Sequence, residues 1–153
     1  MVVLKVKEEA TGKRPSVLSE WYRKQLGRDV AISDIDWVIT SISNKNKENR
    51  YLIIEEKNVS SSNDLIVGLG QYRSLKEVKD DIVKNSIPIF IVFIINEDIS
   101  NGVWLFEFES NYDNNNLRQV GDNWYVDVKK ASRFVSADEL KLLLLTRVGS
   151  DYK

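Results

Sequence analysis

The sequence contains no cysteine and no histidine, and these absences exclude more chemistry than any other feature of its composition. Without cysteine, the chain can form neither a disulfide nor a thiolate zinc site, and it has no thiol nucleophile. Without histidine, it cannot build a Ser-His-Asp triad. Acid–base catalysis would therefore fall to Asp, Glu, Lys or Tyr, and a metal ion would be a hard one held by oxygen ligands.

Long apolar runs and a strong net charge are lacking as well. The longest apolar run, Ile87 to Ile95, is too short to span a bilayer, and the N-terminal residues show no signal-peptide pattern. We therefore expect a cytoplasmic protein that does not enter a membrane. The net charge of −1 argues against indiscriminate polyanion binding but allows a local basic groove. The 153 residues, of which 42% are hydrophobic, fit a single domain over residues 1–153.

The apolar pattern predicts an α/β fold in the order α-β-β-α-β-β-β-α. A first helix is expected from Pro15 to near Gly27, with an apolar stripe formed by Val17, Leu18, Trp21, Tyr22 and Leu26. A second helix is expected over about Leu65 to Lys84, after serine N-cap candidates. A third begins with a capping box at Ser136 and ends near Arg147.

Alternating or continuous apolar residues predict five strands. The segment Ile87–Ile95 is almost entirely β-branched or aromatic, which is typical of a central strand buried on both faces. We expect Asn111–Gly121 to be a loop. The other predicted strands are Val30–Ser41, Tyr51–Lys57, Val103–Glu109 and Trp124–Val128. Together they predict a mixed sheet with helices on its faces.

Charged residues interrupt the first two predicted strands. Glu55 and Lys57 share a face at the end of an apolar strand, while Glu56 points to the other face. If the strands pair as a hairpin, Asp36 and Glu55 converge on one oxygen-rich site with Lys57 beside them. Such a site suits Mg²⁺ or Mn²⁺. Taken singly, each residue also fits a solvated strand end or an ion pair, so the prediction rests on the combination.

This combination resembles the PD-(D/E)XK, or restriction-endonuclease-like, nuclease superfamily. The family pattern has an acid on a first helix, an Asp at a strand bend, (D/E)-x-K on the next strand and often a polar residue on the following helix. These positions are matched in order by Glu20, Asp36, Glu55-Glu56-Lys57 and Gln71. The proline that usually precedes the Asp is missing, and Ser33-Asp34-Ile35 stands in its place. The later elements resemble archaeal Holliday-junction resolvases.

The resemblance implies a metal-dependent deoxyribonuclease with a restriction-endonuclease-like fold, acting as a homodimer on DNA. Asp36, Glu55 and the backbone carbonyl of Glu56 would hold Mg²⁺ or Mn²⁺, and Lys57 would assist the attacking water. Glu20 and Gln71 would complete the catalytic set, although each also fits an exposed polar role. Three alternatives stay open: a branched-DNA resolvase, a non-catalytic module that binds nucleic acid or protein, and a structural protein.

Several basic residues could line such a site and contact phosphates. Those assigned to nucleic-acid binding are Arg14, Arg23, Lys24 and Arg73, with Lys13, Arg28 and Lys76 as further members of a basic rim. Gly68 and Gly70 could allow close approach of a phosphate backbone or of a neighbouring strand. The stripe of Trp104, Phe106 and Phe108 is expected to be core rather than a base-stacking platform, with a dimer surface as the other reading.

Overall fold

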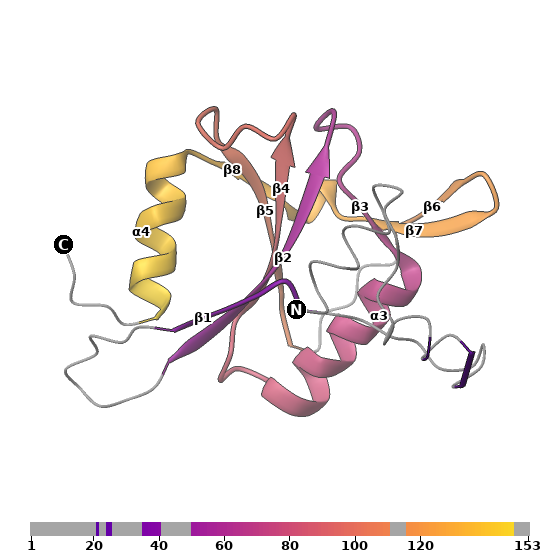
Figure 1. Ribbon diagram of the computed structural model, residues 1–153, viewed down its shortest axis with the longest axis horizontal. Coiled ribbons are helices and arrows are strands. Elements are labelled where there is room, and N and C mark those ends of the chain that lie inside the picture. Colours follow the sequence, from indigo (N-terminus) through magenta and orange to yellow (C-terminus); the bar gives the residue numbers. More distant parts are fainter. Residues whose placement is uncertain (1–20, 22–23, 26–34, 41–49, 111–115, 149–153) are drawn as a thin grey trace.

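The computed structural model describes residues 21, 24–25, 35–40, 50–110 and 116–148. They form an α/β structure with a mixed five-stranded sheet, ordered β1-β2-β4-β5-β8, and a smaller antiparallel sheet, ordered β3-β7-β6. Helices α3 and α4 lie on opposite sides of the larger sheet (Figure 1). The helices are α3 (Leu69–Glu77), the π-helical η1 (Val78–Val83), the 3₁₀ turn η2 (Lys129–Ala131) and α4 (Ala137–Arg147). The strands are β1 (Trp37–Thr40), β2 (Tyr51–Val59), β3 (Ile66–Gly68), β4 (Ile89–Ile95), β5 (Val103–Phe108), β6 (Leu117–Val120), β7 (Asn123–Asp127) and β8 (Arg133–Val135).

Strand β4 is the centre of the larger sheet, as its apolar sequence predicts. All side chains from Ile89 to Ile94 are buried. The strand runs parallel to β2 and antiparallel to β5. Because alternate side chains point to opposite faces of a sheet, a continuously apolar strand requires other elements to pack on both faces.

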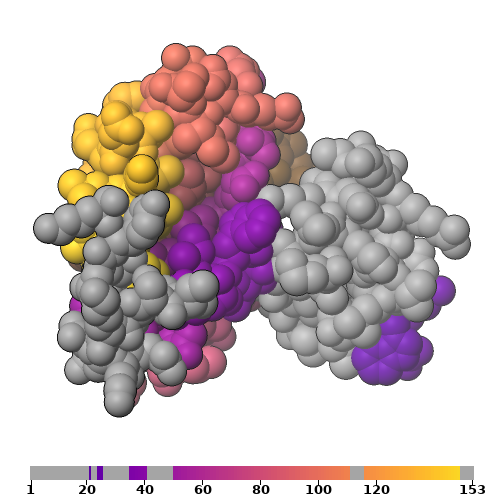
Figure 2. Space-filling model, turned by 60° about the vertical axis from the view of Figure 1, so that its left-hand side comes forward, coloured from indigo at the N-terminus to yellow at the C-terminus, as the bar shows by residue number. Residues whose placement is uncertain are grey.

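Each face of the larger sheet carries its own core. On the α3 face, Phe93 packs with Val67 and Val126 of the smaller sheet. On the α4 face, Phe90 packs in a second cluster that includes Leu144 of α4. Strand β1 lies at the edge of the sheet and is visible at the surface in Figure 2. The aromatic side chains of Phe106 and Phe108 are buried, which confirms the prediction that their stripe belongs to the core, while Trp104 is half-buried against the same core.

Three short strands correct the predicted order of elements. Residues 66–68 form β3 and not the start of a helix, because they pair with β7, and α3 begins only at Leu69. Residues 117–120, predicted as loop, form β6, and the unpredicted β8 pairs with β5. Strands of three or four residues carry too little local pattern to be recognised, and their hydrogen-bond partners lie elsewhere in the chain.

The first predicted strand begins only at Trp37, after Ile35 and Asp36, and the end of the predicted second helix is π-helical from Val78 to Val83. The remaining predicted elements agree with the structure where it describes them. The N-cap of α4 is Ser136, whose Oγ accepts a hydrogen bond from the backbone N–H of Glu139 at 3.1 Å. The predicted first helix lies mostly outside the described residues. Within it, Trp21, Lys24 and Gln25 are helical and Trp21 is 52% exposed, while the other residues of the predicted apolar stripe lie outside the described residues. No helix in the described ranges is both long and apolar enough to cross a membrane.

Candidate functional site

The pairing of β1 with β2 brings Asp36 and Glu55 together. The strands are antiparallel, with Trp37 opposite Ile54, so Asp36 comes next to Glu55 where β1 begins. Asp36 Oδ2 accepts a hydrogen bond from the backbone N–H of Glu56 at 2.7 Å. Both carboxylates are buried, each with 7% exposure. The predicted hairpin geometry and the convergence of the two acids are confirmed.

Glu55 is linked to helix α3 by Gln71. The side-chain amide of Gln71 donates from Nε2 to Glu55 Oε1 at 2.7 Å, and its Oε1 accepts from Lys57 Nζ at 2.5 Å. Lys57 Nζ also lies 3.7 Å from Glu55 Oε1. Both Glu55 and Lys57 thus face α3, as their alternation along β2 predicts. Gln71 thus contacts Glu55 and Lys57 and is not merely solvated, while its part in catalysis stays a prediction.

The packing of α3 explains the position of Gln71. The next residue, Tyr72, is buried and packs against Phe108, with ring centroids 5.2 Å apart, and against Phe106 at 6.3 Å. These contacts anchor the first turn of α3 on the sheet. Gln71 is consequently held over β2, where its amide bridges a carboxylate and an ammonium group.

Glu55 has an unusual electrostatic environment. Burial, followed by the charge of Asp36, raises the pKa of Glu55 from 4.5 to about 7, although Lys57 and the hydrogen bond from Gln71 act in the opposite direction. Its Oε2 is buried and has no hydrogen-bond partner among the residues that the structure describes. Such an oxygen is costly to bury unless another group satisfies it.

The chain shows no significant match to any protein-family model, curated protein or solved structure.

The side chain of Glu56 lies on the opposite face of β2 from Glu55. Its Oε1 accepts from Trp37 Nε1 and its Oε2 from Asn58 Nδ2, both at 3.4 Å. Its backbone N–H contacts Asp36, whereas its carboxylate contacts Trp37 and Asn58; the expected role of its backbone carbonyl as a metal ligand stays a prediction. Among the described residues, no group of three or more Asp or Glu side chains is placed to hold a metal ion.

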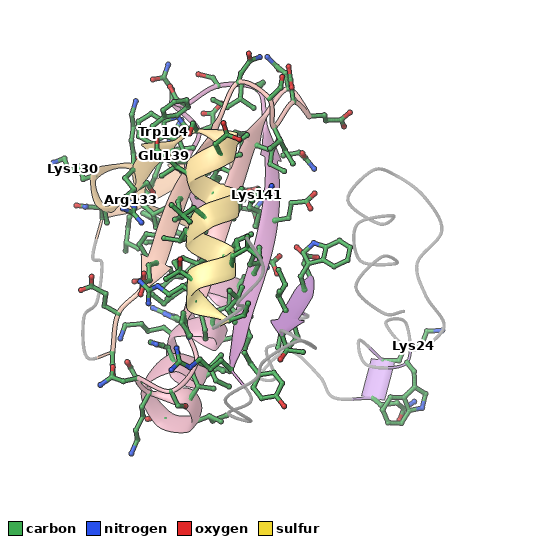
Figure 3. The ribbon with its side chains drawn as sticks, turned by 90° about the vertical axis from the view of Figure 1, so that its left-hand side faces the viewer. Lys24, Trp104, Lys130, Arg133, Glu139 and Lys141 are labelled. Carbon is green, nitrogen blue, oxygen red and sulfur yellow. The ribbon has the colours of Figure 1, made fainter. Side chains whose placement is uncertain are left out.

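The basic residues predicted around the site are only partly described. Arg73 is exposed on α3, two residues beyond Gln71, whereas Lys24 lies away from the sheet in Figure 3. Lys76 is buried and forms an ion pair with Asp80, so its assignment to an open basic rim is wrong. The remaining predicted residues, Glu20, Arg14, Arg23, Lys13 and Arg28, lie outside the described residues.

Gly68 and Gly70 flank the start of α3 beside the site. Among the described residues, none lies within 4 Å of a Cβ added at either glycine. No described strand therefore comes close enough to require glycine at these positions. The second predicted reason for these glycines, space for a phosphate backbone, stays a prediction.

Proposed function

We propose that the protein is a metal-dependent deoxyribonuclease that hydrolyses phosphodiester bonds at the cluster of Asp36, Glu55, Lys57 and Gln71. The observation that carries the proposal is the buried, unsatisfied Oε2 of Glu55 beside a second carboxylate. A carboxylate oxygen left in this state inside an otherwise hydrogen-bonded cluster is a natural position for a cation ligand.

The donor set fits a hard divalent cation. Asp36 and Glu55 would hold Mg²⁺ or Mn²⁺ together with the carbonyl of Glu56, because these ions bind one or two carboxylates and complete their shell with water and substrate oxygens. When bound, such an ion supplies charge stabilisation at the phosphate and a more acidic water. Its positive charge would also favour the ionised form of Glu55.

The other residues of the cluster have roles that follow from their hydrogen bonds. Gln71 fixes the orientation of Glu55 through Nε2 and that of Lys57 through Oε1. Lys57 lies beside Glu55, where its side chain can orient the attacking water or stabilise charge on the phosphate. Water attack on phosphorus forms one P–O bond and breaks one P–O ester bond. The proton that the attacking water loses to solvent is balanced by the proton that the leaving oxygen takes up.

The surroundings suit a phosphate. The first turn of α3 has no acidic residue and no side-chain cap, so its N–H groups and its dipole favour an anion there. The open space at Gly68 and Gly70 leaves room for a DNA backbone. The mixed sheet, with an Asp before one strand, Glu-x-Lys on the next and Gln on the following helix, supports assignment to the restriction-endonuclease-like fold.

A cleavage assay tests the proposal directly. Labelled single-stranded, linear duplex and four-way-junction DNA would be incubated with Mg²⁺ or Mn²⁺, and with EDTA as the blank. We expect metal-dependent cleavage that Glu55→Gln abolishes and that the matched variant Glu109→Gln, an exposed glutamate, leaves unchanged. Preference for the junction would favour a resolvase, and a molar-mass measurement would test the proposed homodimer.

A non-catalytic binding module is the second candidate. It is favoured by the lack of a third carboxylate at the site among the described residues. A folded protein that binds DNA but cleaves none of the three substrates, with equal behaviour of wild type and Glu55→Gln, would select this candidate over the nuclease.

A further inference from the structure

Strand β1 forms the edge of the larger sheet at the candidate site, and hydrogen bonds from its side chains attach both of its ends to β2 or to the residue before it. At the far end, Thr40 Oγ1 donates to the carbonyl of Arg50 at 2.9 Å. At the start, Trp37 Nε1 donates to Glu56 Oε1 at 3.4 Å. Because Asp36 directly precedes this start, its position at the site depends on how the first residue of β1 is attached.

Glu56 is contacted from both faces of the sheet. On the α3 face, Asp36 Oδ2 accepts a hydrogen bond from the backbone N–H of Glu56 at 2.7 Å. On the α4 face, the Glu56 carboxylate accepts from the indole of Trp37 and from Nδ2 of Asn58. Trp37 pairs with Ile54, so its indole reaches the next residue on the same face of β2 along the cross-strand diagonal.

The start of β1 has little else to hold it in place. Trp37 is 43% exposed and belongs to neither of the two core clusters of the described residues. An edge strand of four residues makes few backbone hydrogen bonds, and such strand ends open more readily than the centre of a sheet. A carboxylate is a stronger acceptor than a neutral group, so the bond from Trp37 to Glu56 favours the closed pairing. If the start of β1 opened, Asp36 would leave Glu55.

We propose that Trp37 and Glu56 are positioning residues that hold Asp36 beside Glu55 from the far face of β2. Neither side chain has to contact a metal ion or DNA, because each acts through the start of β1. The positioning of Asp36 for a metal ion rests on the proposed function, whereas the attachment of β1 does not.

Amide hydrogen exchange in EDTA, followed by NMR, tests the attachment of β1 without metal ion or DNA. The amide at position 56 donates to Asp36, so its protection factor measures how often the start of β1 opens. We expect this factor to fall about two- to tenfold in Trp37→Phe, which lacks the indole N–H, and in Glu56→Ala, which lacks the acceptor. Glu56→Gln keeps an oxygen acceptor and should stay closer to the wild type. Unchanged protection of the β4 amides would show that the effect is local.

A double-mutant cycle shows whether the two residues act through each other. Trp37→Phe should have little further effect in the Glu56→Ala background, because its partner is already missing there. The matched control is Glu109→Ala, which removes an exposed glutamate and should leave the protection factor unchanged. Wild-type protection in both single variants, additive losses, or equal losses in Glu56→Ala and Glu56→Gln overturn the inference.

Calorimetric titration with Mn²⁺ separates this inference from the proposed function. Weaker Mn²⁺ binding by Trp37→Phe and Glu56→Ala, with recovery in Glu56→Gln, supports both. If the wild type neither binds Mn²⁺ nor cleaves DNA but the protection factors fall as expected, the attachment of β1 stands and the nuclease fails. Unchanged Mn²⁺ binding by variants with lower protection overturns the positioning role.

Discussion

Replacement of Glu55 by glutamine should stabilise the metal-free protein at neutral and alkaline pH. The pKa of Glu55 is raised from 4.5 to about 7, so the folded state binds this proton more tightly than the unfolded state. The stability that this group contributes is highest below pH 4.5, falls as the pH rises through the window from 4.5 to 7, and is constant above it. A difference of about 2.5 pKa units corresponds to about 3 kcal/mol, at 1.36 kcal/mol per unit.

Glu55→Gln has nearly the same shape and no charge, and its side-chain oxygen can still accept the hydrogen bond from Gln71. We expect the variant to match the wild type near pH 4.5 and to exceed it by about 3 kcal/mol at pH 8. For a chain of this length, that difference would raise Tm by about 6 to 12 °C. A stabilised variant that has lost its activity would be a stability–function trade-off at the site.

Urea unfolding in EDTA between pH 4.5 and 8.5 is the appropriate assay. Comparison of the two proteins at each pH cancels the contributions of other groups, such as Asp98, whose pKa is lowered by hydrogen bonds from Ser100. Glu109→Gln controls for the loss of one negative charge. The reasoning is refuted if Glu55→Gln is no more stable than the wild type at pH 8, because the ion pair with Lys57 and the hydrogen bond from Gln71 would then outweigh burial.

Three further predictions concern the cluster and its support. Gln71→Ala should leave the fold intact but weaken Mn²⁺ binding or turnover about 10- to 100-fold, measured by calorimetry and by the cleavage assay; unchanged values would assign Gln71 a merely structural role. Asp36→Asn keeps an oxygen that can accept the hydrogen bond from the Glu56 backbone but removes a negative charge, so the pKa of Glu55 should fall. NMR titration of the Glu55 carboxyl would detect this fall, and a rise or no change contradicts the proposed role of Asp36. Phe93→Ala should lower the free energy of unfolding in urea by about 3 to 5 kcal/mol, because the fully buried Phe93 side chain packs the larger sheet against β3 and β7. A decrease below about 1 kcal/mol would show that the surrounding core can collapse into the space left by the ring.

The sequence predicted the elements whose signal is local. The apolar run ending at Ile95 predicted a strand buried on both faces, because such a run has no polar side to expose. Ser136 predicted the start of α4 because an N-cap is set by residues within one turn. Alternation along β2 predicted that Glu55 and Lys57 share a face, and the hairpin then predicted their approach to Asp36.

Elements that depend on distant partners were not predictable in the same way. Strand β3 was read as the start of a helix because its pairing with β7 is not visible in its own residues. The position of Phe134 was not predictable either, because β8 is defined by its pairing with β5.

The sequence by itself determined which chemistry was available. A chain without cysteine or histidine, with carboxylates and a lysine at the interruptions of two apolar strands, could offer only an oxygen-rich cluster. Tertiary structure decided how that cluster behaves. The burial of Glu55 beside Asp36 sets its pKa, and the anchoring of Tyr72 on Phe108 places Gln71 between Glu55 and Lys57. These properties depend on which groups the fold removes from water and brings into contact, and a residue pattern along the chain does not contain that information.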